Sequence, residues 1–96
     1  MKKILTLHPQ GKHGVNIDQE KYDLIKSSII EILKTNKEIS FGEMIQIIES
    51  SLAGKFDGSI SWYVVSVKLD LEARGIIRRL PKSSPQIITL SEEGMD

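Results

Sequence analysis

The sequence predicts a mainly α domain that ends in a small β-hairpin, an α+β arrangement. Two observations carry this prediction. Residues 59–74 contain no proline or glycine, and at about 100° per residue they place Ile60, Val64 and Leu71 on one helical face. Gly75 stands where a helix would stop in a left-handed backbone conformation, and the β-branched pair after it favours the start of a strand.

Length and composition indicate one soluble domain. The chain has 96 residues, of which 40% are hydrophobic and 27% charged, as is typical of globular proteins. It contains no cysteine, which excludes disulfides and thiolate sites and fits a reducing cytoplasm. The basic start at residues 2–7 has too short an apolar run for a signal peptide or a membrane span. We therefore expect a cytoplasmic protein that does not associate with membranes.

The N-terminal half is expected to form an arm followed by two helices. Residues 1–16 read as the arm, with a possible short strand at Ile4–Leu7. A single domain over residues 17–90 then begins with a helix from an Asp18 N-cap to about Lys34. Ile39 is expected in a very short strand. The segment Ser40-Phe41-Gly42-Glu43 fits a capping box and predicts a second helix that ends near Leu52.

The C-terminal half is expected to supply a third helix and a hairpin. After a turn in which Phe56 anchors the chain to the core, the third helix precedes strands at residues 76–80 and 86–90. A loop between two prolines joins these strands, and residues 91–96 read as a flexible acidic tail. The order α-(β)-α-α-β-wing-β is that of a winged helix-turn-helix, with the third helix in the recognition position and Lys82–Ser84 at the wing tip.

One motif in this part of the chain resembles a known family. Gly58-Ser59 with Trp62-Tyr63 and the run Val67–Gly75 is similar to a GSxxWYxxxVKLDLEARG-type pattern in a family of small uncharacterised bacterial winged-helix proteins. The resemblance extends from about Gly11 to Leu90. It implies the winged-helix fold and a bacterial cytoplasmic setting, and it carries no catalytic residue.

Nucleic acid is the first partner that the charges suggest. The net charge is zero, yet residues 74–90 carry Arg74, Arg78, Arg79 and Lys82 without any acid. Guanidinium and ammonium groups in and around the wing would bind phosphates weakly and without reading bases. The alternative is that they line a solvated strand edge and keep it from aggregating. On fold analogy we expect a DNA-binding or transcription-regulatory accessory protein.

The third helix favours a different partner, namely protein. Its second apolar face carries Trp62, Val65 and Leu69, flanked by Ser66 and Asp70. Reading base edges requires Arg, Lys, Asn or Gln, and an exposed Asp70 would repel phosphate. The face is instead expected to be covered by the arm at Ile4–Leu7, by a second copy in a homodimer, or by a ligand. The alternative function is thus a dimerising protein-interaction module that makes no DNA contact.

Catalysis, metal binding and cofactors are not expected. The two glycines that flank the turn before the third helix lack the spacing of a phosphate-binding loop. Asp70 and Glu72 lie two apart on a helix, so their carboxylates diverge. The two histidines, His8 and His13, have no acidic or thiol partner nearby in sequence, so we expect them to be solvated rather than to bind a metal.

Overall fold

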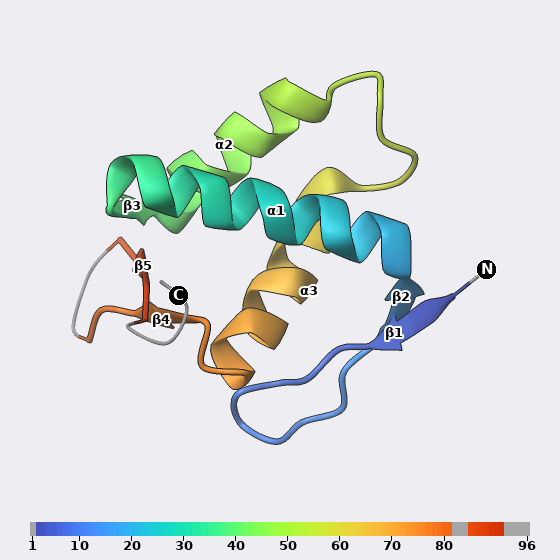
Figure 1. Ribbon diagram of the computed structural model, residues 1–96, viewed down its shortest axis with the longest axis horizontal. Helices are drawn as coiled ribbons and strands as arrows, with labels where there is room; N and C mark the ends of the chain where they lie inside the picture. Colours follow the sequence, from blue (N-terminus) through green and yellow to red (C-terminus); the bar gives the residue numbers. More distant parts are fainter. Residues whose placement is uncertain (1, 82–84, 92–96) are drawn as a thin grey trace.

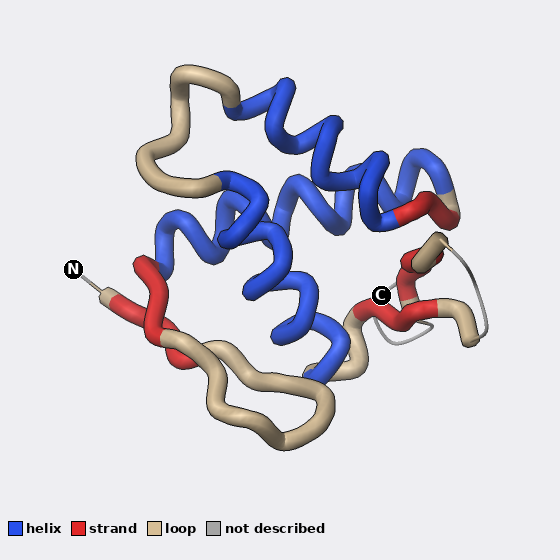
Figure 2. Tube along the Cα trace, turned by 180° about the vertical axis from the view of Figure 1, so that it is seen from behind, coloured by secondary structure: helices blue, strands red, loops and turns tan. Residues whose placement is uncertain are grey.

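The computed structural model describes residues 2–81 and 85–91, and it has a mixed α+β fold with three helices and two small antiparallel sheets. In Figure 1, α1 spans the molecule, α2 lies above it, and a sheet stands at each end of α1. In the view from behind, α3 crosses in front of α1 (Figure 2). The helices are α1 (Gln19–Asn36), α2 (Phe41–Leu52) and α3 (Ile60–Ala73).

Each helix begins at a side-chain cap, and the sequence predicts the first two, at Asp18 and Ser40. Asp18 accepts a hydrogen bond from the amide of Lys21, and the Ser40 hydroxyl accepts one from the amide of Glu43. Ser59 accepts in the same way from the amide of Trp62. These hydroxyl and carboxylate oxygens satisfy amides that have no partner within the helix, so local sequence fixes all three starts.

The end of α3 is also as predicted. Gly75 has a φ of 77°, a region that glycine adopts without the steric cost of a Cβ atom. Its amide and that of Ile76 bond back to the carbonyls of Glu72 and Leu71, so that the chain reverses immediately. The strand β4 (Ile77–Arg79) follows and pairs with β5 (Ile87–Leu90).

The second sheet has the strand order β3-β5-β4, because the short strand β3 (Glu38–Ser40) pairs with the other edge of β5. The expected strand at Ile39 is therefore present, and its partner is Ile88. The expected wing tip at residues 82–84 and the expected tail at residues 92–96 lie outside the described residues.

The arm forms a hairpin of its own. Strand β1 (Lys3–Leu5) pairs in antiparallel register with β2 (Asn16–Asp18), and Ile4 faces Ile17 across the pair. Ile17 is buried in the core, and Ile4 and Val15 of the arm are partly buried against it, so the arm contributes to the packing. Among the described residues, no helix is long and apolar enough to cross a membrane.

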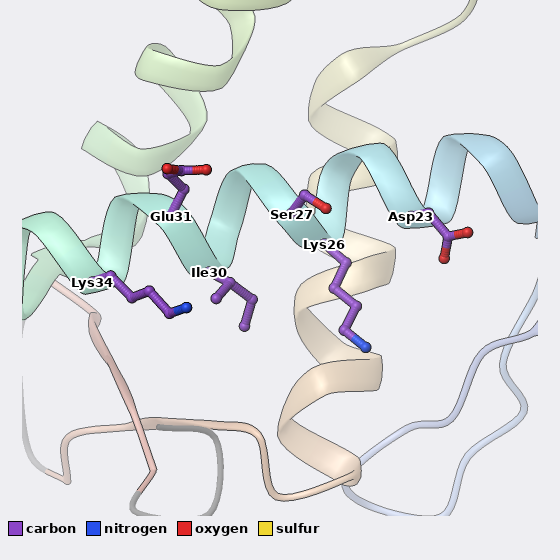
Figure 3. Close-up of a pocket in the computed structure, with 6 residues that line it drawn as sticks. All are labelled: Asp23, Lys26, Ser27, Ile30, Glu31 and Lys34. Atoms are coloured by element: carbon purple, nitrogen blue, oxygen red, sulfur yellow. The ribbon is translucent and has the colours of Figure 1, made fainter. Parts of the chain in front are cut away.

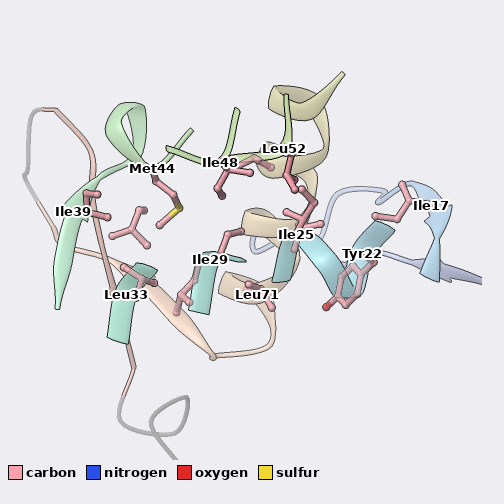
Figure 4. Packing of buried hydrophobic residues seen from close by; sticks show 14 residues of the cluster. Ile17, Tyr22, Ile25, Ile29, Leu33, Ile39, Met44, Ile48, Leu52 and Leu71 are labelled. Atoms are coloured by element: carbon pink, nitrogen blue, oxygen red, sulfur yellow. The ribbon is translucent and has the colours of Figure 1, made fainter. Parts of the chain in front are cut away.

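One core joins the helices and the second sheet, as Figure 4 shows. Its centre is aliphatic, with Met44 at the point where α2 approaches β3. The buried members lie at helical spacing in all three helices, as the periodicity of the sequence predicts. They are Ile17, Tyr22, Ile25, Ile29, Leu33, Ile39, Met44, Ile48, Leu52, Val64, Val67, Leu71, Ile77 and Ile88.

Candidate functional site

The outer face of α3 is the most distinctive surface of the described chain. Val64, Val67 and Leu71 point inward, which turns Trp62, Val65 and Leu69 to the opposite side. Trp62 is 45% exposed and Val65 39%, while Leu69 is half-buried. Ser66 and Ala73 complete this face, which we call the α3 face. None of its five side chains carries a charge.

The charged side chains of α3 lie on its flanks, where they pair with one another. Lys68 and Glu72 form an ion pair on one flank, and the Lys68 ammonium also stands 5.0 Å from the centre of the Phe41 ring. On the other flank, Nε of Arg74 donates to Oδ2 of Asp70 at 2.8 Å. These two i,i+4 pairs leave the α3 face between them without a charge.

Asp70 is not the exposed, phosphate-repelling residue that the sequence predicts. Its side chain is completely buried, because the arm and α1 close over that flank of the helix. The amide of Leu7 donates to Oδ1 at 2.8 Å, and the hydroxyl of Tyr22 donates to Oδ2. A buried carboxylate needs such donors to offset its lost hydration. Together with Nε of Arg74, the donors come from the arm, from α1 and from the end of α3.

The pKa values of its partners follow from this burial. Desolvation of the Tyr22 hydroxyl, together with the hydrogen bond to Asp70 and the charge of that carboxylate, raises the pKa of Tyr22 well above its ordinary value. The hydrogen bond to Asp70 is also the main reason that the pKa of Arg74 is raised. The cluster therefore holds a protonated tyrosine and a protonated arginine around one carboxylate.

The arm is anchored at Asp70 and does not cover the α3 face, contrary to the first of the expected covers. Thr6 is buried and its hydroxyl accepts from the amide of Val15, which ties the two sides of the arm together. Leu5 and Leu7 remain 58% and 44% exposed, because their side chains alternate with the buried Thr6 along the extended chain. Of the covers proposed from sequence, a second copy and a ligand remain.

Aromatic rings support the N-terminal end of the α3 face. The ring of Tyr63 meets the rings of Phe56 and Trp62 edge to face, at centroid distances of 5.1 and 5.0 Å. The Lys21 ammonium lies 5.2 Å from the Tyr63 ring and donates to the carbonyl of Asp57 at 2.7 Å. This arrangement fixes the turn before α3 to α1, and with it the position of Trp62.

Two features of the sequence indicate the contacts around Asp70, although hydrophobic periodicity alone does not reveal them. Tyr22 lies on the core face of α1, where a buried phenol hydroxyl requires a partner. Asp70 and Arg74 have the i,i+4 spacing of a helical ion pair. Combining the two would have indicated a buried Tyr22–Asp70–Arg74 cluster.

The four basic residues predicted to contact phosphates around the wing differ in their exposure and in the partners that they already have. Arg78 and Arg79 are exposed on β4, which is an edge strand of the sheet. Arg74 is exposed in part, but its Nε is already bound to Asp70. Lys82 lies outside the described residues. The structure therefore places Arg78 and Arg79 next to each other on β4, and Arg74 before the chain reversal, at the C-terminal end of α3.

The outer side of α1 has an open hollow of about 410 Å³. Figure 3 shows Lys26, Ile30 and Lys34 on one side of the helix and Glu31 on the other. Asp23 and Glu31 balance the two lysines, and all the lining residues belong to this one helix. The hollow is thus a charge-balanced helix surface. Across the described residues, no three His, Cys, Asp or Glu side chains are grouped to hold a metal.

These features define a small α+β protein whose chief exposed feature is an uncharged helix face. The chain belongs to a family of unknown function, DUF6958, whose family model matches residues 3–88. The match includes the arm hairpin, both sheets almost to their ends and all three helices. No curated protein and no solved structure matches the chain.

Proposed function

We propose that this chain is a protein-interaction module of the winged-helix type that self-associates through the α3 face. The observation that carries the proposal is the exposure of Trp62 and Val65, 45% and 39%, on a face without charge. Leaving such side chains in water forgoes about 1.5–3 kcal/mol for each one that could be fully buried. Contiguous exposed apolar surface of this kind is typical of protein contacts.

The order of elements supports the winged-helix part of the proposal. A short strand lies between the first two helices, and α3 leads into the β4–β5 hairpin of a three-stranded sheet. In DNA-binding relatives of this arrangement, the helix in the position of α3 enters the major groove with polar side chains. The apolar α3 face lacks that chemistry, which favours protein as its partner.

A second copy is the partner that best fits the α3 face. In an antiparallel two-fold pairing, Trp62 would lie opposite the partner's Ala73, and Leu69 opposite the partner's Ser66. Large side chains then meet small ones across the contact, as ridges fit into grooves between packed helices. Because the face is uncharged, the pairing brings no like charges together, and the antiparallel arrangement also opposes the two helix dipoles favourably.

Sedimentation velocity over a range of protein concentrations tests self-association directly. We expect the full-length chain to sediment as a dimer, and Leu69→Asp to weaken association on the order of 100-fold or more, because it buries an unpaired charge. Leu24→Asp is the matched control, since Leu24 is also exposed, at 44%, but lies on α1. A chain that stays monomeric at every concentration, or a Leu69→Asp variant that still dimerises, would overturn the proposal.

A second candidate function is weak binding of DNA by a transcription-regulatory accessory protein. The observation in its favour is the exposure of both Arg78 and Arg79 on the edge strand β4. With Lys82 and the free part of the Arg74 guanidinium, they would contact the phosphate backbone. Such contacts position a protein on DNA without reading its sequence.

The salt dependence of binding to labelled duplex DNA tests this candidate. Four basic groups predict a log–log slope of about −3 to −4. Arg78→Glu together with Arg79→Glu should lower the affinity for DNA of every sequence alike. Lys26→Glu on α1 is the control, because it changes the charge of one residue by the same amount at a site away from the wing. Absence of binding at low salt would leave only the protein-interaction role.

A further inference from the structure

A second apolar surface lies between α1 and α2, which lies obliquely above α1 in Figure 1 and contacts it. Leu24 of α1 and Ile47 of α2 are 44% and 43% exposed, and they face a common hollow of about 360 Å³. Ile32 and Ile48 also line it, so both helices contribute apolar groups, and Ser27, Ser28 and Ser51 stand among them. This surface, which we call the α1–α2 groove, is separate from the α3 face.

The charged side chains that line the groove are acidic, and Lys26 and Lys34 lie on the opposite side of α1 from Glu31 (Figure 3). Glu31 is the charged residue that lines the hollow, and Glu43 lines an adjoining hollow that shares Ile47. From residue 38 to residue 54 the chain has acidic residues at Glu38, Glu43 and Glu49 and no lysine or arginine. An apolar floor with an acidic border complements a segment that is apolar on one side and basic on the other.

We propose that the α1–α2 groove binds a basic amphipathic helix of a partner protein. Apolar side chains at i, i+3 or i+4, and i+7 of such a helix would enter the hollow beside Leu24 and Ile47. Lysine or arginine side chains at its edges would reach Glu31 and Glu43. Outside the α3 face, the exposed large apolar side chains of the described helices are Leu24 and Ile47 themselves. A second copy of the groove would bring its own Glu31 and Glu43 against these glutamates, so the occupant comes from another protein.

NMR titration of the isotope-labelled full-length chain with two synthetic peptides tests the proposal. The peptides share leucines at helical spacing and differ only in whether lysine or glutamate fills the polar positions. We expect the lysine peptide to shift amide signals of α1 and α2 around Leu24 and Ile47, and to bind at least about 10-fold more tightly than the glutamate peptide. Raising the salt concentration should reduce that difference.

Variants of the groove make the test specific. Glu31→Gln with Glu43→Gln should weaken the lysine peptide by about 5- to 10-fold, and glutamine at position 43 preserves capping at Ser40. Ile47→Ser should weaken both peptides, whereas Val65→Ser on the α3 face should change neither. Equal affinity for the two peptides, shifts confined to the α3 face or the wing, or no shifts at all would overturn the proposal. None of these results bears on self-association through Leu69, which sedimentation measures separately.

Discussion

The hydroxyl of Tyr22 donates a hydrogen bond to the carboxylate of Asp70, which lies 48 positions later in the chain. This bond connects the first turns of α1 to the last turns of α3, and the same carboxylate binds the amide of Leu7 in the arm. One buried acid therefore joins α1, α3 and the arm through polar contacts, in addition to the apolar packing of α1 against α3. Its loss should be felt as a loss of global stability.

Tyr22→Phe should lower the free energy of unfolding by about 1.5–3 kcal/mol, the usual contribution of a hydrogen bond to a charged group. The ring remains in the core, so the change isolates the hydroxyl. Urea unfolding followed by circular dichroism measures the effect. Tyr63→Phe is the matched control, because Tyr63 makes ring contacts to Phe56 and Trp62 that phenylalanine preserves. Equal small effects of the two substitutions would contradict the role assigned to the Tyr22–Asp70 bond.

The same cluster predicts a loss of stability in alkaline solution. The pKa of Tyr22 is higher in the folded chain than in the unfolded chain, so the folded state holds this proton more tightly. The contribution of Tyr22 is thus fully present below the ordinary tyrosine pKa of about 10 and is lost as the pH rises beyond it.

Unfolding measured from neutral pH to above pH ~10 in the wild type and in Tyr22→Phe isolates this contribution. The wild type should lose its advantage over the variant as the pH increases, while lysine deprotonation affects both proteins alike. A stability difference that stays constant across this range would exclude a raised pKa at Tyr22.

The arm hairpin makes a close backbone contact at Gly14, and this contact gives a sharp prediction. A Cβ atom at Gly14 would lie 1.7 Å from the carbonyl oxygen of Thr6, so Gly14→Ala must displace the backbone. At Gly42, in the first turn of α2, a Cβ atom would meet nothing within 4 Å. Gly42→Ala should therefore stabilise the chain by up to about 0.5–1 kcal/mol through helix propensity.

Thermal unfolding of the two variants should move in opposite directions. Gly14→Ala should also expose the amide of Leu7 to hydrogen exchange, because the arm would no longer hold it against Asp70. An unchanged melting temperature for Gly14→Ala would mean that the arm contributes nothing to the stability of the domain.

The helices and their ends were predictable because they depend on neighbouring residues. Ser40 and Ser59 cap helices through amides three positions away, and Gly75 ends α3 through its own backbone freedom. Trp62 and Val65 were likewise placed on the outer side of α3 by the period of the helix. These parts of the fold and of the candidate site need no knowledge of distant contacts.

The position of the arm and the burial of Asp70 could not be predicted in this way. The amide of Leu7 reaches Asp70 across 63 positions, and helical periodicity places Asp70 on a flank that is exposed or buried according to what packs there. The same contact holds the arm beside Asp70, on a flank of α3 and not over the α3 face. Of the three covers expected for Trp62 and Val65, the arm is therefore the one that the structure does not show, since both side chains remain exposed.

Two residues that end helices, Gly75 and Lys37, carry the last prediction. Both have positive φ, 77° at Gly75 and 66° at Lys37. Glycine tolerates this region, whereas a side chain there costs about 1–2 kcal/mol. Lys37 is held in place because its amide donates to the carbonyl of Leu33 and its own carbonyl accepts from the hydroxyl of Thr89. The strain at Lys37 is therefore offset by hydrogen bonds that join the end of α1 to β5.

Lys37→Gly should raise the free energy of unfolding by about 0.5–1 kcal/mol, and Gly75→Ala should lower it by about 1 kcal/mol or more. Urea unfolding of each single variant measures these changes. Lys37→Ala is the matched control, since it removes the same charged side chain but keeps a Cβ atom in the strained conformation. If Lys37→Ala stabilises the chain as much as Lys37→Gly, the gain comes from the lost charge, and the backbone at Lys37 stores no strain.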